Sequence, residues 1–282
     1  MTAQTGARRL SGVGIGLRFE LWAALRQTER RLDWLEVIAE NYSEQGGWRR
    51  RQLDEAASRW PVVAHGVSVS VGGADLLDVD NLRRLKRLLD EVGAEFYSDH
   101  LCWTSYGSHH YHDLLPLPRT EEAVRWCAAR ARQVSDALER PLLLENVTYY
   151  ATMPGSVLDE GEFVRAVLEE SSAYLLLDVN NVYLNAKNHG RDPLQTLLAL
   201  PLERTRQIHL AGHEPDEEGV LLDRHGSPVA SEVWELYREA IKRVGDVPTL
   251  IEWDNDIPAL DRVLDEADRA RAIQQQELAH VA

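Results

Sequence analysis

Six imidazole or carboxylate side chains lie at or near the ends of short apolar segments of the sequence. The segments are VVAH, FYSDH, LLLE, YLLLD, QIHL and TLIE, and their polar residues are His65, His100, Glu145, Asp178, His209 and Glu252. Buried parallel strands consist of unbroken apolar runs, and parallel α/β proteins carry their chemistry at the carboxyl ends of such strands. If these segments are parallel strands, all six side chains point into one mouth.

The combination of these residues indicates a metal site, although each one alone is weak support for it. A single histidine at a strand end is more often a hydrogen-bonded structural residue than a ligand. Three carboxylates buried together without counter-charge, however, would be strongly unfavourable or would become protonated. Divalent or trivalent cations remove that penalty, and the mixture of nitrogen and oxygen ligands suits Zn, Mn or Fe. A carboxylate such as Glu145 can bridge two ions.

A third cation position is predicted in the loop that follows the segment QIHL. Asp223 and His225 have D-x-H spacing there, and Asn181 can join them from the end of the segment YLLLD. An amide is a weak ligand, and a salt bridge within the loop is the alternative interpretation.

Strand-like and helix-like segments alternate along the chain, as they must to bring these side chains together. Strands are expected at residues 12–18, 32–38, 61–69, 95–101, 141–147, 174–180, 205–211 and 247–253. Helices are expected at residues 20–28, 48–59, 80–92, 120–138, 160–171, 193–199, 231–244 and 258–271, with Thr120 and Ser231 as N-caps. Long loops are expected at residues 103–119 and 212–228.

About eight such units favour a closed (β/α)8 TIM barrel of the α/β class. A doubly wound open sheet is the alternative, but GVGIG near the N-terminus lacks the acidic residue that follows a dinucleotide-binding fingerprint. We expect one TIM-barrel domain over residues 1–282, with a core at about 12–271 and flexible segments at 1–11 and 272–282.

Composition and charge exclude several classes of protein. The 282 residues carry a formal net charge of −15, which disfavours non-specific binding of nucleic acid. No stretch approaches the ~20 apolar residues of a membrane span, and the N-terminus lacks the apolar core of a signal peptide. Two cysteines give no disulfide framework. These features predict a cytoplasmic protein that binds neither nucleic acid nor membranes.

Several longer strings resemble the DUF692 (UPF0276) family, whose members are described as multinuclear non-haem iron-dependent oxidative enzymes. They are WLEVIAENY, VVAHGVSVSVGG, YSDHLCW, LLLENVTYY, LLLDVNNVYLNAKNHG, QIHLAGH and IEWDNDIP, and the resemblance runs from about residue 12 to about residue 271. The family is similar to the xylose isomerase-like barrels, whose relatives include endonuclease IV.

The resemblance implies a ligand assignment for two or three iron ions. It places one iron at His65, His100 and Glu145. The resemblance implies that a second iron is held by Glu145, Asp178, His209 and Glu252, and a third by Asn181, Asp223 and His225.

The resemblance also implies an activity. The substrate would be a residue, usually cysteine, of a ribosomally synthesised precursor peptide, and dioxygen would be the co-substrate. A separate small partner protein would recognise the leader of the peptide.

Other polar residues are predicted to surround the mouth. Asp254, His213, Asn146 and Asn180 could orient ligands or accept protons, and each could equally be a hydrogen-bonding residue of the barrel rim. One of Glu36, Glu40 and Asn41 could line the pocket, and His109, His110 and His112 could form part of a substrate-facing lid.

Two other functions remain open at this point. A sugar isomerase would use Mn, Mg or Zn at the shared ligands and a lysine to polarise the carbonyl, and of the three lysines only Lys187 is expected near the mouth. A metal-loaded scaffold that holds a peptide without catalysis is the other. A repair endonuclease is disfavoured by the acidic charge.

Overall fold

Eight parallel strands form a closed barrel in the computed structural model, which describes residues 10–44, 46–107 and 109–279. In order around the barrel they are β1 (Val13–Gly16), β2 (Leu35–Ile38), β3 (Val62–His65), β4 (Tyr97–His100), β7 (Leu142–Glu145), β8 (Tyr174–Asp178), β9 (Thr205–Ala211) and β12 (Thr249–Glu252). Strand β12 pairs with β1 and closes the sheet. The predicted (β/α)8 barrel is confirmed, and the open doubly wound sheet is wrong.

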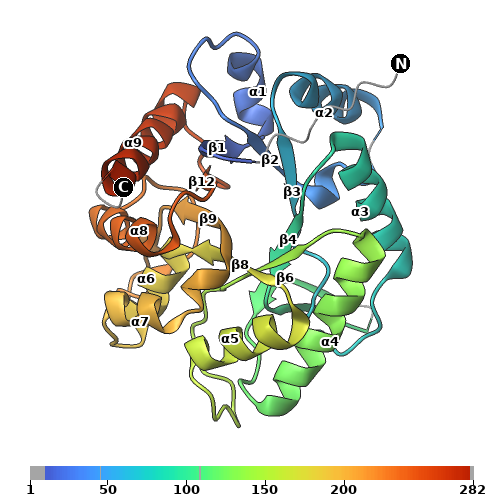
Figure 1. The fold of residues 1–282 in the computed structure, drawn as a ribbon, viewed down its shortest axis with the longest axis vertical. Coiled ribbons are helices and arrows are strands. Elements are labelled where there is room, and N and C mark those ends of the chain that lie inside the picture. The colour runs from blue at the N-terminus through green and yellow to red at the C-terminus, as the bar shows by residue number, and fades with distance from the viewer. Residues whose placement is uncertain (1–9, 45, 108, 280–282) are drawn as a thin grey trace.

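Helices surround the barrel on its outside (Figure 1). They are α1 (Phe19–Leu25), α2 (Gly47–Arg59), α3 (Val79–Val92), α4 (Glu121–Leu138), α5 (Glu160–Ser171), α6 (Val179–Asn188), α7 (Pro193–Ala199), α8 (Ser231–Val244) and α9 (Leu260–Ala279). No helix among the described residues is both long and apolar enough to cross a membrane.

The two-residue period of the strands divides their side chains between two faces. One set packs outward against the helices, and the other set forms a separate apolar cluster inside the barrel. The inner cluster contains Leu10, Trp34, Val63, Phe96, Leu143, Leu176 and Leu250. The residues two positions further along the chain have their side chains on the same inner face. They are Glu36, His65, Ser98, Glu145, Asp178 and Glu252. An apolar layer therefore lies directly beneath a polar layer at the carboxyl ends of the strands.

The glycines of β1 make room for large side chains inside the barrel. A Cβ atom on Gly14 would lie 2.4 Å from Cδ2 of Trp34, and one on Gly16 would lie 2.6 Å from Nη1 of Arg18. The GVGIG segment thus has a packing explanation.

Two expected loops contain strands. Residues 103–119 include an antiparallel hairpin of β5 (Trp103–Tyr106) and β6 (His109–Leu115), and residues 212–228 include β10 (Glu214–Pro215) and β11 (Leu221–Leu222). These strands were not predicted. In β5 and β6, Trp103, Thr104, Tyr106 and Tyr111 are aromatic or β-branched residues, which favour pairing even on an exposed hairpin.

Several predicted boundaries were also wrong. The sixth strand ends at Asp178, whose Oδ1 caps α6 by accepting a hydrogen bond from the Asn181 backbone N–H at 2.6 Å. Thr120 is an N-cap as predicted, but the N-cap of α8 is Ala230 and not Ser231.

Helix α9 continues to Ala279 instead of ending at residue 271. The buried Gln274 Nε2 donates to the Val247 carbonyl at 2.9 Å, so this part of the expected flexible segment is packed helix. At the other end, Leu10 is buried in the inner cluster. The rest of the two terminal segments, residues 1–9 and 280–282, lies outside the described residues.

Candidate metal centre

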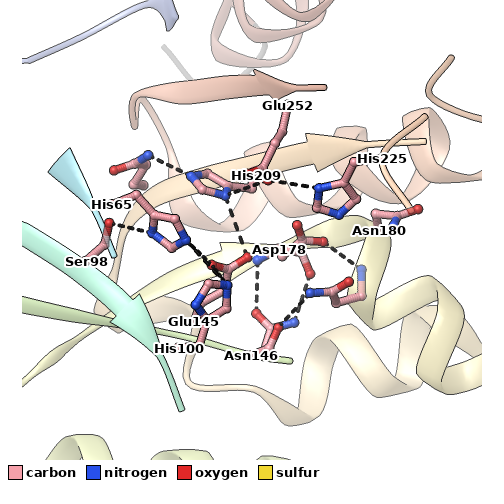
Figure 2. Close-up of polar contacts among 12 residues, drawn as sticks. His65, Ser98, His100, Glu145, Asn146, Asp178, Asn180, His209, His225 and Glu252 are labelled. Carbon is pink, nitrogen blue, oxygen red and sulfur yellow. Dashed lines mark hydrogen bonds and ion pairs between the residues drawn. The ribbon is translucent and has the colours of Figure 1, made fainter. Parts of the chain in front are cut away.

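Two histidines and a glutamate meet at the ends of three neighbouring strands, β3, β4 and β7 (Figure 2). Oε2 of Glu145 lies 3.3 Å from Nε2 of His65 and 3.3 Å from Nε2 of His100. The other ring nitrogens are held from outside: Nδ1 of His65 lies 2.9 Å from Oγ of Ser98, and Nδ1 of His100 donates to the Gly66 carbonyl at 3.1 Å. Both imidazoles thus direct Nε2 at the carboxylate.

A second group lies beside the first and shares Glu145 with it. One ligand atom from each of Glu145, Asp178, His209 and Glu252 lies within 4.8 Å of the others. Nδ1 of His209 is 3.1 Å from Oε2 of Glu252 and 3.6 Å from Oε1 of Glu145. Glu145 therefore turns one oxygen to each group, which is the arrangement of a carboxylate that bridges two cations.

His209 is held from below by residues in the barrel interior. Its Nε2 lies 3.3 Å from Oε2 of Glu36 and 2.9 Å from Nε2 of Gln207. Gln207 also donates to Glu36 at 2.6 Å. Because Nε2 is occupied on this side, Nδ1 is the nitrogen that faces the carboxylates of the mouth. Metal-binding histidines are usually oriented in this way by an outer partner.

The third predicted group lies at the rim of the mouth. Nε2 of His225 is 2.7 Å from Oδ1 of Asp223, and its Nδ1 is 2.9 Å from Oδ2 of Asp254 and 3.5 Å from Oε2 of Glu252. Asn181 lines the same cavity, where its Oδ1 accepts from Oγ1 of Thr148 at 2.7 Å. The assignment of Asn181, Asp223 and His225 to one cation stays a prediction.

Asn146, Asn180 and His213 connect the loops around the mouth. Asn146 Nδ2 donates to the Asp178 carbonyl at 2.9 Å, and the Asp178 N–H donates to Oδ1 of Asn146 at 3.0 Å. Asn180 Nδ2 donates to Oδ1 of Asp223 at 3.2 Å, and its Oδ1 lies 2.8 Å from Nδ1 of His213. These contacts are those of orienting residues, and the catalytic roles predicted for the three remain untested.

Three residues of the site were missed by the sequence analysis. Ser98 and Gln207 lie two residues before His100 and His209, so the period of the strands could have placed them inside the barrel. Arg18 had no such signal: it follows β1 and reaches Asp254, 236 residues away, where Nη2 donates to Oδ1 at 2.5 Å. Of the expected lid, His110 and His112 line the cavity over the centre.

The ionisation of the buried groups reflects their crowding. Burial, together with the charges of Glu145 and Asp223, raises the pKa of Asp178 well above its ordinary value. Burial also lowers the pKa of His65, and the neighbouring His100 adds to this effect. For His209, burial alone would lower the pKa, but the surrounding carboxylates outweigh it and raise the pKa well above 6.5.

The residues present fit a cluster of cations. Two buried carboxylate oxygens accept no hydrogen bond from any described residue: Glu145 Oε2 and Asp178 Oδ2. Buried polar atoms are rarely left without a partner. Because both carboxylates belong to the group whose ligand atoms lie within 4.8 Å of one another, a cation would satisfy their oxygens and offset the repulsion between them.

A cavity of about 1150 Å³ opens above the centre. Its walls include Phe19 and Trp48, whose rings meet edge to face at 5.1 Å between centroids, and Tyr150 from the loop after β7. Phe19 is 67% exposed and Trp48 is 45% exposed. The cavity exceeds the ~300–1,000 Å³ typical of small-molecule sites.

Most of the chain is similar to the members of one protein family. Residues 12–275 match the model of a family described as RiPP precursor modification enzyme MbnB/TglH/ChrH, where RiPP denotes ribosomally synthesised and post-translationally modified peptides. A UPF0276 protein of Caulobacter vibrioides is 47% identical over 262 residues, 93% of each chain. One of Acaryochloris marina is 44% identical over 261 residues, 93% of this chain and 94% of the other.

Solved structures resemble the chain in fold alone. A D-tagatose 3-epimerase-like protein superposes with a TM-score of 0.62 at 14% identity, covering 96% of this chain and 100% of its own. A D-psicose 3-epimerase of Clostridium cellulolyticum H10 superposes with a TM-score of 0.58 at 12% identity, covering 95% and 99%. These neighbours share the TIM-barrel fold with this chain, and one of them, from Mycobacterium smegmatis, is described as a xylose isomerase-like TIM barrel protein.

Proposed function

Because the chain belongs to the MbnB/TglH/ChrH family of RiPP precursor modification enzymes, we propose that it is an iron-dependent oxidase of a precursor peptide. The substrate residue is a cysteine, the co-substrate is dioxygen, and a separate small protein recognises the leader of the peptide. The family supports a peptide-modifying, metal-dependent enzyme, and the iron, the dioxygen, the cysteine and the partner are our proposal.

The observation that carries this proposal is the position of Glu145 between two groups of ligand atoms. One oxygen faces the two histidines of β3 and β4, and the other faces His209 at 3.6 Å. A shared carboxylate of this kind would hold two cations close together, as in two-metal sites.

The chain's own residues orient and isolate the reacting groups. Ser98, Gly66 and Glu36 fix the imidazoles from outside, so that the ligand nitrogens need little reorganisation. The apolar layer beneath the centre excludes water from the barrel interior. Iron held at the mouth would supply the redox chemistry and would favour the anionic form of a coordinating thiol.

The cavity supports a peptide over a sugar as the substrate. Its volume of about 1150 Å³ suits a chain of several residues, and exposed aromatic rings on its wall can contact apolar side chains of a peptide. None of the described residues that line it is a lysine, and Lys187 is exposed on α6. The lysine-dependent isomerase is therefore disfavoured.

The test combines metal analysis with turnover. The protein is loaded with Fe²⁺ under nitrogen and then mixed, in oxygenated buffer, with each short cysteine-containing peptide found to be encoded near its gene, and oxygen uptake and peptide mass are followed. We expect bound iron, oxygen consumption that depends on the peptide, and a loss of hydrogen from the peptide. Iron and peptide binding without oxygen uptake would favour the non-catalytic scaffold instead.

Asp178→Asn separates the role of Asp178 as a metal ligand from its role as the N-cap of α6. Asparagine caps a helix about as well as aspartate, so α6 keeps its N-cap while the site loses a charged ligand. Asp192→Asn is the matched control, because Asp192 caps α7 by accepting from the Gln195 N–H at 2.8 Å. We expect Asp178→Asn to lose turnover and Asp192→Asn to keep it. Full turnover by Asp178→Asn would reject the centre.

A further inference from the structure

A buried arginine lies between the second group of ligand atoms and the third. The side chain of Arg18 follows β1 into the mouth and is only 10% exposed. Its Nε donates to the Trp253 carbonyl at 3.0 Å, and its Nη2 donates to Oδ1 of Asp254 at 2.5 Å. The same Nη2 is 3.9 Å from Oε1 of Glu252. A Cβ on Gly16 would come within 2.6 Å of the guanidinium, so β1 leaves space for this path.

Each oxygen of Asp254 has a hydrogen-bond partner, in contrast to Oε2 of Glu145 and Oδ2 of Asp178. Oδ1 accepts from Arg18, and Oδ2 lies 2.9 Å from Nδ1 of His225. A carboxylate with one oxygen on a guanidinium and the other on an imidazole is suited to orient the imidazole.

His225 is held in an uncommon backbone conformation by the same segment. Its φ is +49°, in the left-handed region that few non-glycine residues adopt. The N–H groups of Asp254 and Asn255 donate to its carbonyl at 3.0 and 3.3 Å. Strain of this kind persists only where surrounding contacts impose it. The result is an imidazole whose Nε2 lies 2.7 Å from Oδ1 of Asp223.

We propose that Arg18 is a positioning residue for the third cation site. Through Asp254 it fixes the ring of His225 so that Nε2 faces Asp223, and its charge keeps Asp254 and Glu252 from repelling each other. Without Arg18, Asp254 is free to turn, His225 loses its orientation, and the third cation binds weakly. The other two positions have their own supports in Ser98, Gly66 and Glu36.

This inference rests on the metal centre but not on the peptide chemistry. Its test is a Co²⁺ titration of the metal-free protein, followed by visible absorption and by metal analysis after gel filtration. Arg18→Gln removes the positive charge and the hydrogen bonds to the Trp253 carbonyl and to Asp254. We expect it to bind the last cation about 10- to 100-fold more weakly than the wild type, as losses of outer partners commonly do, and to keep the tight ones.

Arg130→Gln is the matched control. Arg130 is a buried arginine of α4 whose side chain donates to the backbone carbonyls of Val71, Asp75 and Ser70. It separates the general cost of losing a buried guanidinium from an effect on the mouth. Arg18→Lys keeps the charge but cannot make both hydrogen bonds at once, so it should bind the last cation more tightly than Arg18→Gln and more weakly than the wild type. Circular dichroism checks that each variant is folded.

The outcomes divide cleanly. Selective weakening of one cation in Arg18→Gln, with Arg130→Gln like the wild type, supports the proposal. An unchanged titration of folded Arg18→Gln, a loss of all cations together, or equal losses in the two glutamine variants would overturn it. A wild-type protein that binds no cation rejects the metal centre itself.

Discussion

Each histidine at the mouth uses its two ring nitrogens for different purposes. One nitrogen contacts an outer partner, and the other points toward the carboxylates, so the direction of every ring is set before a cation binds. The outer partners are Ser98 for His65, the Gly66 carbonyl for His100, Glu36 with Gln207 for His209, and Asp254 for His225. Pre-oriented ligands lower the reorganisation needed on binding.

Cation binding should release protons, because several of these groups hold protons in the metal-free protein. Nearby carboxylates overcome the effect of burial and raise the pKa values of His209 and His225 well above 6.5, and burial raises that of Asp178. A group with a raised pKa stays protonated to higher pH, and a cation must displace that proton. We therefore expect Co²⁺ affinity to increase as the pH rises above 6.5.

Calorimetry in two buffers of different ionisation enthalpy measures the number of protons released. Glu36→Gln removes the first carboxylate that raises the pKa of His209, so this variant should release fewer protons than the wild type. Affinity that is independent of pH, with no buffer-dependent heat, would contradict the expectation.

At the scale of the elements, the width of the barrel depends on the glycines of β1. Gly14 faces the indole of Trp34, which is completely buried in the apolar layer. An indole in a packed core cannot retreat as a flexible side chain can. The first strand therefore has to present almost no side chain at this level for the polar layer above to close.

Gly14→Ala should destabilise the protein by overpacking. The new Cβ would lie 2.4 Å from the Trp34 ring, and such insertions cost about 1–3 kcal/mol. Urea denaturation measures the change in the free energy of unfolding. Gly46→Ala is the control, because its Cβ would meet nothing within 4 Å, and we expect a cost below about 1 kcal/mol at this N-cap position. Equal losses in the two variants would refute the packing explanation.

The barrel strands and most helices could be predicted from local pattern, whereas other elements could not. The run of three leucines before Asp178 identifies a buried strand. The pattern does not show that Asp178 both ends this strand and caps α6, so the predicted strand extended too far, to residue 180. The hairpin of β5 and β6 has no buried face along HHYHD, so the alternation that identifies a strand is absent there.

Part of the candidate site could be predicted from the sequence, and part of it could not. The six strand-end residues could be predicted because topology alone brings the ends of parallel strands together. Arg18 could not, because its role depends on the closure of the barrel between β1 and β12, at opposite ends of the chain. Long-range pairs of this kind leave no periodic signal in a single sequence.

At the scale of the molecule, Asp33 ties the last helix to the first two strands. Its Oδ2 accepts from the Val13 N–H at 2.8 Å and from Nε of Arg271, on α9, at 3.2 Å. Its Oδ1 accepts from Nε of Arg31 at 2.8 Å. The carboxylate thus joins both ends of the described chain at the closure of the barrel.

Part of the stability of the fold should be lost in acid through Asp33. Burial alone would raise its pKa, but the Val13 hydrogen bond and the two arginines outweigh burial and lower the pKa below 3.8. A lowered pKa gives stability that is present above the ordinary value and is lost as pH falls through the folded one. Asp33→Asn should flatten the fall in urea midpoint between about pH 5 and about pH 2. Asp136→Asn, an exposed position on α4, should keep the wild-type slope.

The centre also couples function to global stability, because its ligands come from strands all around the barrel. In the metal-free protein, the charges of Glu145 and Asp223 act against ionisation of Asp178, so the site destabilises the fold that holds it. A cation that binds only the folded state adds about 2.7 kcal/mol at a concentration 100-fold above its Kd. For a chain of this size, that corresponds to a rise in Tm of about 5 °C.

Asp178→Asn separates the two effects in a thermal unfolding experiment. It keeps the cap of α6 and removes a crowded acid, so the metal-free variant should be at least as stable as the metal-free wild type. With Co²⁺ present, however, its Tm should rise far less than that of the wild type, and EDTA should reverse both rises. A metal-free variant that melts well below the metal-free wild type would mean that Asp178 is chiefly a structural residue. If the metal-free variant instead melts above the metal-free wild type and gains little stability from Co²⁺, Asp178 serves metal binding at a cost to the stability of the fold.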